Sequence, residues 1–256
     1  MKAGRWGVPV FIRVLLLALA ALLPPAPALA AETRVAVAAN FTAPAKAIAV
    51  AFAKATGHEA VLSFGASGIF YAQIAQGAPF DIFLSADSDR PRKAEADGLA
   101  VRGSRFTYAI GRLVLYSAKP GLVDARGAVL RRGGFERIAI ADPAAAPYGA
   151  ASVSVMKRLG VYPALQPRIV TGSSITQAYQ FVATGAAELG FVALSQVVDQ
   201  PGGSRWLVPA GLHAPIEQQA ILLRTGAGNP AAIAFLAFLK GRQAGAIIRH
   251  YGYEIR

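Results

Sequence analysis

Apolar and polar positions along the chain form short strand-like runs, and each run is followed by a stretch with helical spacing. Residues 34–39 form a short run that is apolar after Arg34, and the run predicts a strand. Ile48, Phe52 and Ala55 then recur at the intervals of an amphipathic helix, and Gly57 stands where helices commonly end. The same succession of strand and helix continues to the C-terminus.

This alternation predicts an α/β protein with mostly parallel sheets flanked by helices. The long apolar strand at 107–117 and the later strand at 220–223 are the natural places for the chain to cross between two lobes. We therefore expect a discontinuous first lobe, 31–112 plus 220–256, and a second lobe, 113–219. The expected strands cover 34–39, 61–64, 82–86, 107–117, 137–141, 168–171, 189–193 and 220–223. The expected helices cover 42–55, 69–76, 91–96, 151–159, 175–184, 230–239 and 242–251.

The first thirty residues have the pattern of a secretory signal peptide. Basic residues come first, an unbroken apolar run covers 14–23, and Ala28-Leu29-Ala30 has the small residues of a cleavage site. A membrane anchor is the alternative, but the run is short against the about twenty residues that a spanning helix needs. No Cys follows the run, which excludes a lipoprotein anchor. We expect a signal peptide at 1–30, cleavage after Ala30 and a periplasmic protein.

Composition narrows the classes of function further. The chain is 54% hydrophobic and 16% charged, which excludes a disordered protein. It contains no Cys, so disulfides, thiolate metal sites and cysteine nucleophiles are excluded. The formal charge of +12 becomes +9 when 1–30 is removed, and the basic residues are spread thinly. We expect no nucleic-acid partner.

Four of the expected strand-to-helix turns carry similar small or polar residues. They are Asn40-Phe41-Thr42, Gly65 to Gly68, Pro147-Tyr148-Gly149 and Gly172-Ser173-Ser174. Each turn alone is explained by ordinary helix capping. A parallel sheet, however, gathers such turns at the carboxyl ends of its strands, where helix N-termini present free N–H groups. Four of them together favour an anion-binding cleft.

None of these four turns contains Lys, Arg, Asp or Glu. Neutral donors hold a fully ionised oxyanion through charge-assisted hydrogen bonds. A protonated anion such as hydrogen phosphate also needs an acceptor for its proton, usually a carboxylate. The turns therefore favour a tetrahedral dianion without a proton at pH 7, such as sulfate or molybdate.

In this order, the turns and several further segments resemble the periplasmic molybdate-binding proteins of bacterial molybdate ABC transporters. The segment from Gly77 to Asp87, GAPFDIFLSAD, is the most specific. The resemblance covers about residues 33–255. It implies a two-lobed type II periplasmic binding protein with its ligand cleft between the lobes. The other segments are Val37 to Phe41, Ser63 to Gly68, Ala146 to Gly149, Gly190 to Ala193 and Leu239 to Tyr253.

The resemblance also implies the ligand and the partners. The ligand is molybdate or tungstate, bound as an intact oxyanion without direct protein–metal bonds, and no cofactor is needed. The partner is the membrane permease of the transporter, and the binding protein is a monomer. The site residues that correspond are Ala39, Asn40, Ser67, Tyr148 and, through its backbone N–H, Ile175.

Some members of the family place a Tyr hydroxyl on the ligand from the strand at 189–193. The corresponding residue in this chain is Ala193, which has no side-chain donor. We expect Tyr148 to take over this role.

Two alternatives remain open. One is a type II binding protein for another oxyanion, such as sulfate or thiosulfate. The other is an exported hydrolase with Ser67 as its nucleophile. The serine motif GxSxG fails for Ser67 because Ile69 stands at the second glycine position, and none of the three His residues has an evident serine context. We therefore expect a binding protein and not an enzyme.

Overall fold

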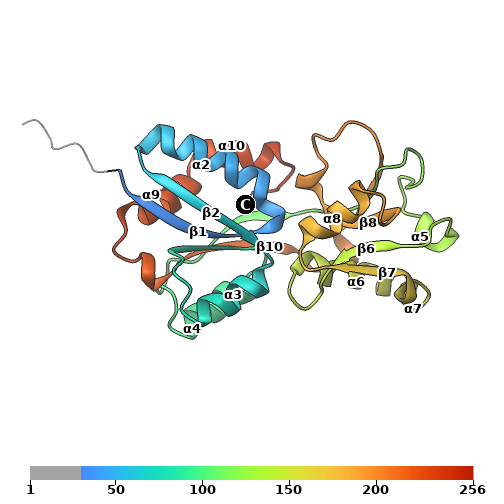
Figure 1. Ribbon diagram of the computed structural model, residues 1–256, viewed down its shortest axis with the longest axis horizontal. Helices are drawn as coiled ribbons and strands as arrows, with labels where there is room; N and C mark the ends of the chain where they lie inside the picture. Colours follow the sequence, from blue (N-terminus) through green and yellow to red (C-terminus); the bar gives the residue numbers. More distant parts are fainter. Residues whose placement is uncertain (1–29, 256) are drawn as a thin grey trace, which may run out of the picture. The chain divides into compact units, whose positions relative to one another are not determined.

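The computed structural model describes residues 30–255. The predicted signal peptide lies outside the described residues except for Ala30, so its extent and its cleavage stay predictions. The described chain forms two five-stranded sheets, each with helices packed against it (Figure 1). The expected α/β class is thereby confirmed.

In the first sheet, β1 (Glu32–Ala38) lies between β2 (Glu59–Gly65) and β3 (Ile82–Ser85) and runs parallel to both. Next to β3 lies β10 (Ile216–Leu222), followed by the edge strand β4 (Phe106–Gly111). β10 is antiparallel to both of its neighbours. The other four strands therefore run in one direction, as the expectation of mostly parallel sheets requires.

The second sheet repeats this arrangement. β6 (Ile138–Ala141) is parallel to β7 (Ile169–Gly172) on one side and to β8 (Leu189–Ala193) on the other. β5 (Leu113–Ser117) is antiparallel to β8 and to the edge strand β9 (Ser204–Leu207). Both sheets thus bring the carboxyl ends of three adjacent parallel strands to one edge.

Helices cover both faces of the first sheet (Figure 1). Val35 and Val37 of β1 pack in one cluster with Phe52, whereas Ala36 packs in another cluster with Phe70. Strands that are covered on both faces read as nearly continuous apolar runs, which is why β3 is apolar up to its last residue. The helices beside this sheet are α2 (Thr42–Thr56), α3 (Ser67–Ala75), α4 (Asp89–Ala96), α9 (Pro230–Leu239) and α10 (Arg242–His250).

The second sheet packs against α6 (Pro147–Arg158) and α8 (Ile175–Ala183), with two single-turn helices, α5 (Val129–Arg132) and α7 (Tyr162–Leu165). Across residues 30–255, no single helix has the length and apolar character to cross a bilayer; only α9 and α10 taken together do, and a 60° bend separates them. Short 3-10 helices are η1 (Ala39–Phe41), η2 (Gln166–Arg168), η3 (Leu194–Gln196), η4 (Ala210–Leu212) and η5 (Arg224–Gly226).

The chain crosses between the sheets twice. The strand predicted at 107–117 is two strands, β4 in the first sheet and β5 in the second, with Arg112 between them. The return precedes Ile216, because all of β10 belongs to the first sheet. The division into lobes of 31–112 plus 220–256 and 113–219 stays our proposal, with its last boundary moved to before Ile216.

Candidate functional site

Four helix N-termini meet at one small cavity. Two follow β1 and β2 of the first sheet, and two follow β6 and β7 of the second. This is where parallel strands place their carboxyl ends. All five residues predicted from the sequence lie together here. The lining residues are Ala38, Ala39, Asn40, Gly65, Ala66, Ser67, Ala86, Ala146, Pro147, Tyr148 and Ile175.

The size and the charge of the cavity limit what it can hold. Its volume is about 10 Å³, far below the roughly 300–1,000 Å³ of pockets that bury organic ligands. None of its lining residues carries a charge. Free N–H groups and the positive ends of helix dipoles supply its polarity. The cavity is therefore too small for an organic ligand, and its polarity favours an anion.

Asn40 is buried at the start of the first of these helices, in η1. Its amide Nδ2 donates to Gln218 Oε1 at 2.9 Å and to the Tyr253 hydroxyl at 3.0 Å. Both amide hydrogens are therefore used behind the cavity. The backbone N–H groups of Ala39 and Asn40, in the first helical turn, have no intrahelical acceptor. We therefore expect Asn40 to contact a ligand through its backbone N–H and not through its side chain.

Ser67 is the first residue of α3, and Ala66 is the N-cap. The interpretation of Ser67 as an ordinary capping residue is therefore wrong. Its Oγ accepts a hydrogen bond of 2.9 Å from the backbone N–H of Ala86, in the turn after β3. A hydroxyl that accepts in this way keeps its own proton to donate. Ser67 is 1% exposed and lines the cavity, so this proton has the anion site within reach.

Tyr148 is the second residue of α6, after Pro147. Its hydroxyl accepts from Gln218 Nε2 at 3.3 Å, and burial raises its pKa well above the ordinary value. A Cβ on Gly149 would lie 2.2 Å from the Ala141 carbonyl oxygen, so only glycine allows this turn to lie against the end of β6. Ala193 does not line the cavity. The Tyr148 hydroxyl contacts Gln218, which does not line the cavity, and its expected contact with the ligand stays a prediction. The backbone N–H of Tyr148, in the first turn of α6, is a second donor without an intrahelical acceptor.

Ile175 is the first residue of α8, and Ser174 is its N-cap. The Ser174 hydroxyl accepts from the N–H of Gln177, in its own helix, at 3.3 Å. Its oxygen therefore caps the helix. Ile175, which is 3% exposed, lines the cavity and has only a backbone N–H to donate.

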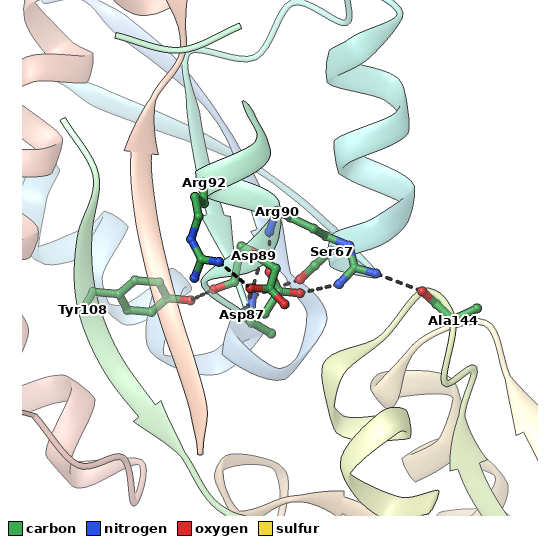
Figure 2. A network of polar contacts seen from close by, with 9 residues as sticks. Ser67, Asp87, Asp89, Arg90, Arg92, Tyr108 and Ala144 are labelled. Carbon is green, nitrogen blue, oxygen red and sulfur yellow. Dashed lines mark hydrogen bonds and ion pairs between the residues drawn. The ribbon is translucent and has the colours of Figure 1, made fainter. Parts of the chain in front are cut away.

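Hydrogen bonds join the two halves of the cavity. The N–H of Gly68 donates to the Ala145 carbonyl at 2.9 Å, and Arg90 Nη2 donates to the Ala144 carbonyl at 2.9 Å. Figure 2 shows Arg90 between its ion-pair partner Asp87, in the first half, and Ala144, in the second. These bonds hold the two sheets together around the site. Two more are Thr176 Oγ1 to the Ala39 carbonyl (3.3 Å) and Ser195 Oγ to the Asn40 carbonyl (2.7 Å).

Sequence reasoning missed the buried polar groups behind the cavity. Gln218 is fully buried, and its contacts to Asn40 and Tyr148 join residues 178 and 70 positions apart. No spacing rule connects residues at such separations, and only the folded chain brings them together. The other members of the network are Tyr108, Ser195 and Tyr253.

Acidic and histidine groups do not gather at this site. No group of three or more His, Asp or Glu residues that would hold a metal ion occurs in the described part of the chain. Asp142 accepts from the N–H of Ala144 at 2.9 Å, as the turn residue that the sequence indicated. The contact of His58 is with the N–H of Ala31, and that of His250 is with Asp199. The site is therefore equipped to bind an anion, and we find no nucleophile–base pair at Ser67.

The comparisons with known proteins agree with this geometry. Residues 33–254 match the family described as bacterial extracellular solute-binding protein. Molybdate-binding protein ModA of Rhodobacter capsulatus is 59% identical over 227 residues, which are 89% of this chain and 90% of that protein. ModA of Azotobacter vinelandii is 56% identical over 230 residues, with 89% and 91% covered.

The solved structure of the Azotobacter vinelandii periplasmic molybdate-binding protein matches with a TM-score of 0.86 and 47% identity. The match covers 88% of this chain and 100% of that one. The expected fold, a two-lobed type II binding protein, is thereby confirmed, as is the resemblance. The chain belongs to the bacterial extracellular solute-binding protein family, among the relatives of the ModA molybdate-binding proteins.

Proposed function

We propose that this protein binds molybdate outside the cytoplasm, in the periplasm, and delivers it to the permease of an ABC transporter. The observation that carries the proposal is the meeting of four uncharged helix N-termini at one small cavity. The names of the relatives, molybdate-binding proteins in two bacteria, support the choice of ligand.

The chemistry follows from the donors. The residues that line the cavity offer the backbone N–H groups of Ala39, Asn40, Tyr148 and Ile175 and the hydroxyl of Ser67, and none of them is a carboxylate. Hydrogen bonds to an ionised oxygen are roughly twice as strong as neutral ones. A dianion uses all of these donors, whereas hydrogen phosphate finds no carboxylate to accept its proton. Tungstate has the same charge and shape as molybdate, and we propose that it binds as well.

The anion is held as an intact MoO₄²⁻ group through its oxygens, with no bond from the protein to the metal. The protein acts as a carrier, not as an enzyme, and we propose that it works as a monomer. Sulfate and thiosulfate remain the competing ligands, because they share the dianionic charge of molybdate.

Calorimetry of the chain from Ala31 onward, against molybdate, tungstate, sulfate and phosphate, tests the proposal. We expect one molybdate or tungstate ion per chain, much weaker binding of sulfate and none of phosphate. Tighter binding of sulfate than of molybdate would show that the protein is a sulfate-binding protein instead. No binding of any oxyanion, together with turnover of simple esters or phosphoesters, would favour the hydrolase instead.

A further inference from the structure

We propose that Gln218 is a positioning residue that couples the two halves of the anion site. The inference rests on the proposed function and adds to it a residue that does not line the cavity. Gln218 is fully buried on β10, in the first sheet. Its side chain hydrogen-bonds to site residues of both halves: Asn40, after β1, and Tyr148, after β6.

Every polar atom of the Gln218 amide has a partner. Oε1 accepts from Asn40 Nδ2 at 2.9 Å and from the Tyr108 hydroxyl at 2.9 Å. Nε2 donates to the Tyr148 hydroxyl at 3.3 Å. Because two donors converge on Oε1, the amide has a fixed orientation, and its N–H points toward Tyr148. The contact with Tyr148 requires the two sheets to be together.

The backbone around Gln218 fits this role. The pairing of β10 with β4 shifts its register between Gln218 and Gln219. Such bulges re-aim side chains and are common near functional sites. Across the pair, a Cβ on Gly111 would lie 2.2 Å from the Tyr148 hydroxyl oxygen and 2.7 Å from Gln218 Nε2. The glycine leaves the room in which the two halves make their contact.

A neutral group is needed at this position. The titratable groups around Gln218 are Tyr108, Tyr148 and Tyr253, and burial raises the pKa of all three, so each stays protonated at neutral pH. Asp87 also acts on Tyr108 from the turn after β3. A carboxylate at position 218 would place a negative charge behind a site that binds a dianion, and it would have no N–H to give to Tyr148.

Two variants test the role of Gln218. Gln218→Met keeps the length of the side chain but removes its hydrogen bonds, and we expect molybdate affinity to fall about tenfold or more. Gln218→Glu reproduces the pattern while it is protonated, because its carbonyl accepts and its O–H donates to Tyr148. Burial raises the pKa of such a carboxyl. We therefore expect near-normal affinity at pH 6 and a loss of at least about tenfold by pH 9.

Gln219 provides matched controls. It is 6% exposed and adjacent in sequence, but its amide bonds to Arg105 Nη1 at 2.7 Å and to Thr107 Oγ1 at 3.2 Å, both near or in β4 of the first sheet. Gln219→Met and Gln219→Glu should leave molybdate affinity and its pH profile unchanged. Melting of each variant without ligand confirms that it is folded.

The outcomes separate the two proposals. If the unmodified chain does not bind molybdate, the proposed function fails and the role of Gln218 fails with it. If the unmodified chain binds molybdate and both Gln218 variants bind it as tightly as the unmodified chain at pH 6 and at pH 9, only the role of Gln218 is contradicted. Equal losses in the Gln218 and Gln219 variants would also contradict it. A pH-dependent loss of molybdate affinity that occurs only in Gln218→Glu supports the proposal that Gln218 couples the two halves of the site.

Discussion

Ser67 gives the cavity a side-chain donor beside its backbone N–H groups. Ser67→Ala removes this donor, and a hydrogen bond to a charged group is worth about 1.5–3 kcal/mol. We expect molybdate affinity to fall roughly ten- to a hundredfold in calorimetry. The variant also leaves the N–H of Ala86 without its acceptor, so the free protein should lose about 1–3 kcal/mol of unfolding free energy.

Ser104 is the matched control for this substitution. Its Oγ also accepts from a backbone N–H, that of Leu222, at 3.2 Å, but it does not line the cavity. Ser104→Ala should lower the melting temperature and leave affinity unchanged. If Ser67→Ala binds molybdate as tightly as the unmodified chain, the site is wrongly assigned at its centre.

The buried tyrosines lead to a prediction about pH. Burial raises the pKa of Tyr253 to about 12, and those of Tyr108 and Tyr148 are also raised. The folded chain therefore keeps these protons in a range where the unfolded chain loses them. By linkage, their contribution to stability is complete below about pH 10 and declines as the pH rises toward 12.

Thermal melts across pH 8–12 should show this decline in stability.

Molybdate affinity should stay constant between about pH 6 and 9, since the residues that line the cavity do not titrate in this range. An affinity that follows a group with a pKa near 6 or 7 would show that a histidine or a carboxylate contacts the ligand.

At the scale of single residues, the turns after parallel strands indicated where an anion site lies, and the resemblance to the family implied Ala39, Asn40, Ser67, Tyr148 and Ile175. All five line one cavity. The atoms that donate were harder to predict. The amide of Asn40 is used by Gln218 and Tyr253, and these partners lie 178 and 213 residues away in the sequence. Such pairings follow from tertiary packing and leave no local pattern.

Among the elements, α4 carries a contact that joins the two halves beside the cavity, at what we call the rim of the site. Arg90 pairs with Asp87 and donates to the Ala144 carbonyl of the other half (Figure 2). Arg90→Met should therefore speed molybdate dissociation by about tenfold, as the loss of one charge-assisted hydrogen bond across the rim predicts. Arg92 lies on the same helix and pairs with Asp89, with 61% of its side chain exposed.

Arg92→Met is the control, because exposed ion pairs contribute little. Stopped-flow measurement of dissociation distinguishes the two arginines, and equal rates would contradict the contact. Gly68→Ala tests the same rim without a change of charge. Its added Cβ would lie 3.0 Å from the Ala145 carbonyl oxygen and 2.9 Å from Arg90 Nη2, so it should also speed dissociation.

Helices and strands followed the hydrophobic pattern where burial is uniform and departed from it where polar groups are buried. The strand predicted at 220–223 is β10, which begins earlier, at Ile216. The prediction began too late because Glu217, Gln218 and Gln219 look like a polar loop in the sequence. Of these, both glutamines are buried and hydrogen-bonded. The edge strand β9 was missed because only Trp206 of its residues is buried, which leaves no alternation to detect.

For the molecule as a whole, we expect the two crossings to act as a hinge. The chain passes between the sheets at Arg112 and again between β9 and β10. Residues of both halves line the cavity, so a dianion bound there should stabilise the closed arrangement over an open one. Small-angle scattering should show a smaller radius of gyration with molybdate than without it. An unchanged curve at saturating molybdate would indicate a preformed, static site.

The two-lobed organisation was accessible from the sequence because the strand and helix alternation is interrupted by one long apolar strand, now seen as β4 and β5. The antiparallel direction of β10 and β5 could not be predicted, since the pattern of one strand does not show which way its neighbours run.

We propose that uncharged helix N-termini from both halves hold an intact oxyanion. Diffraction from crystals grown with molybdate, recorded at the molybdenum absorption edge, tests it most directly. We expect a single anomalous peak in the cavity, with oxygens facing Ser67 and the N–H groups of Ala39, Asn40, Tyr148 and Ile175. A peak at another place, or one coordinated by carboxylates or histidines, would contradict it.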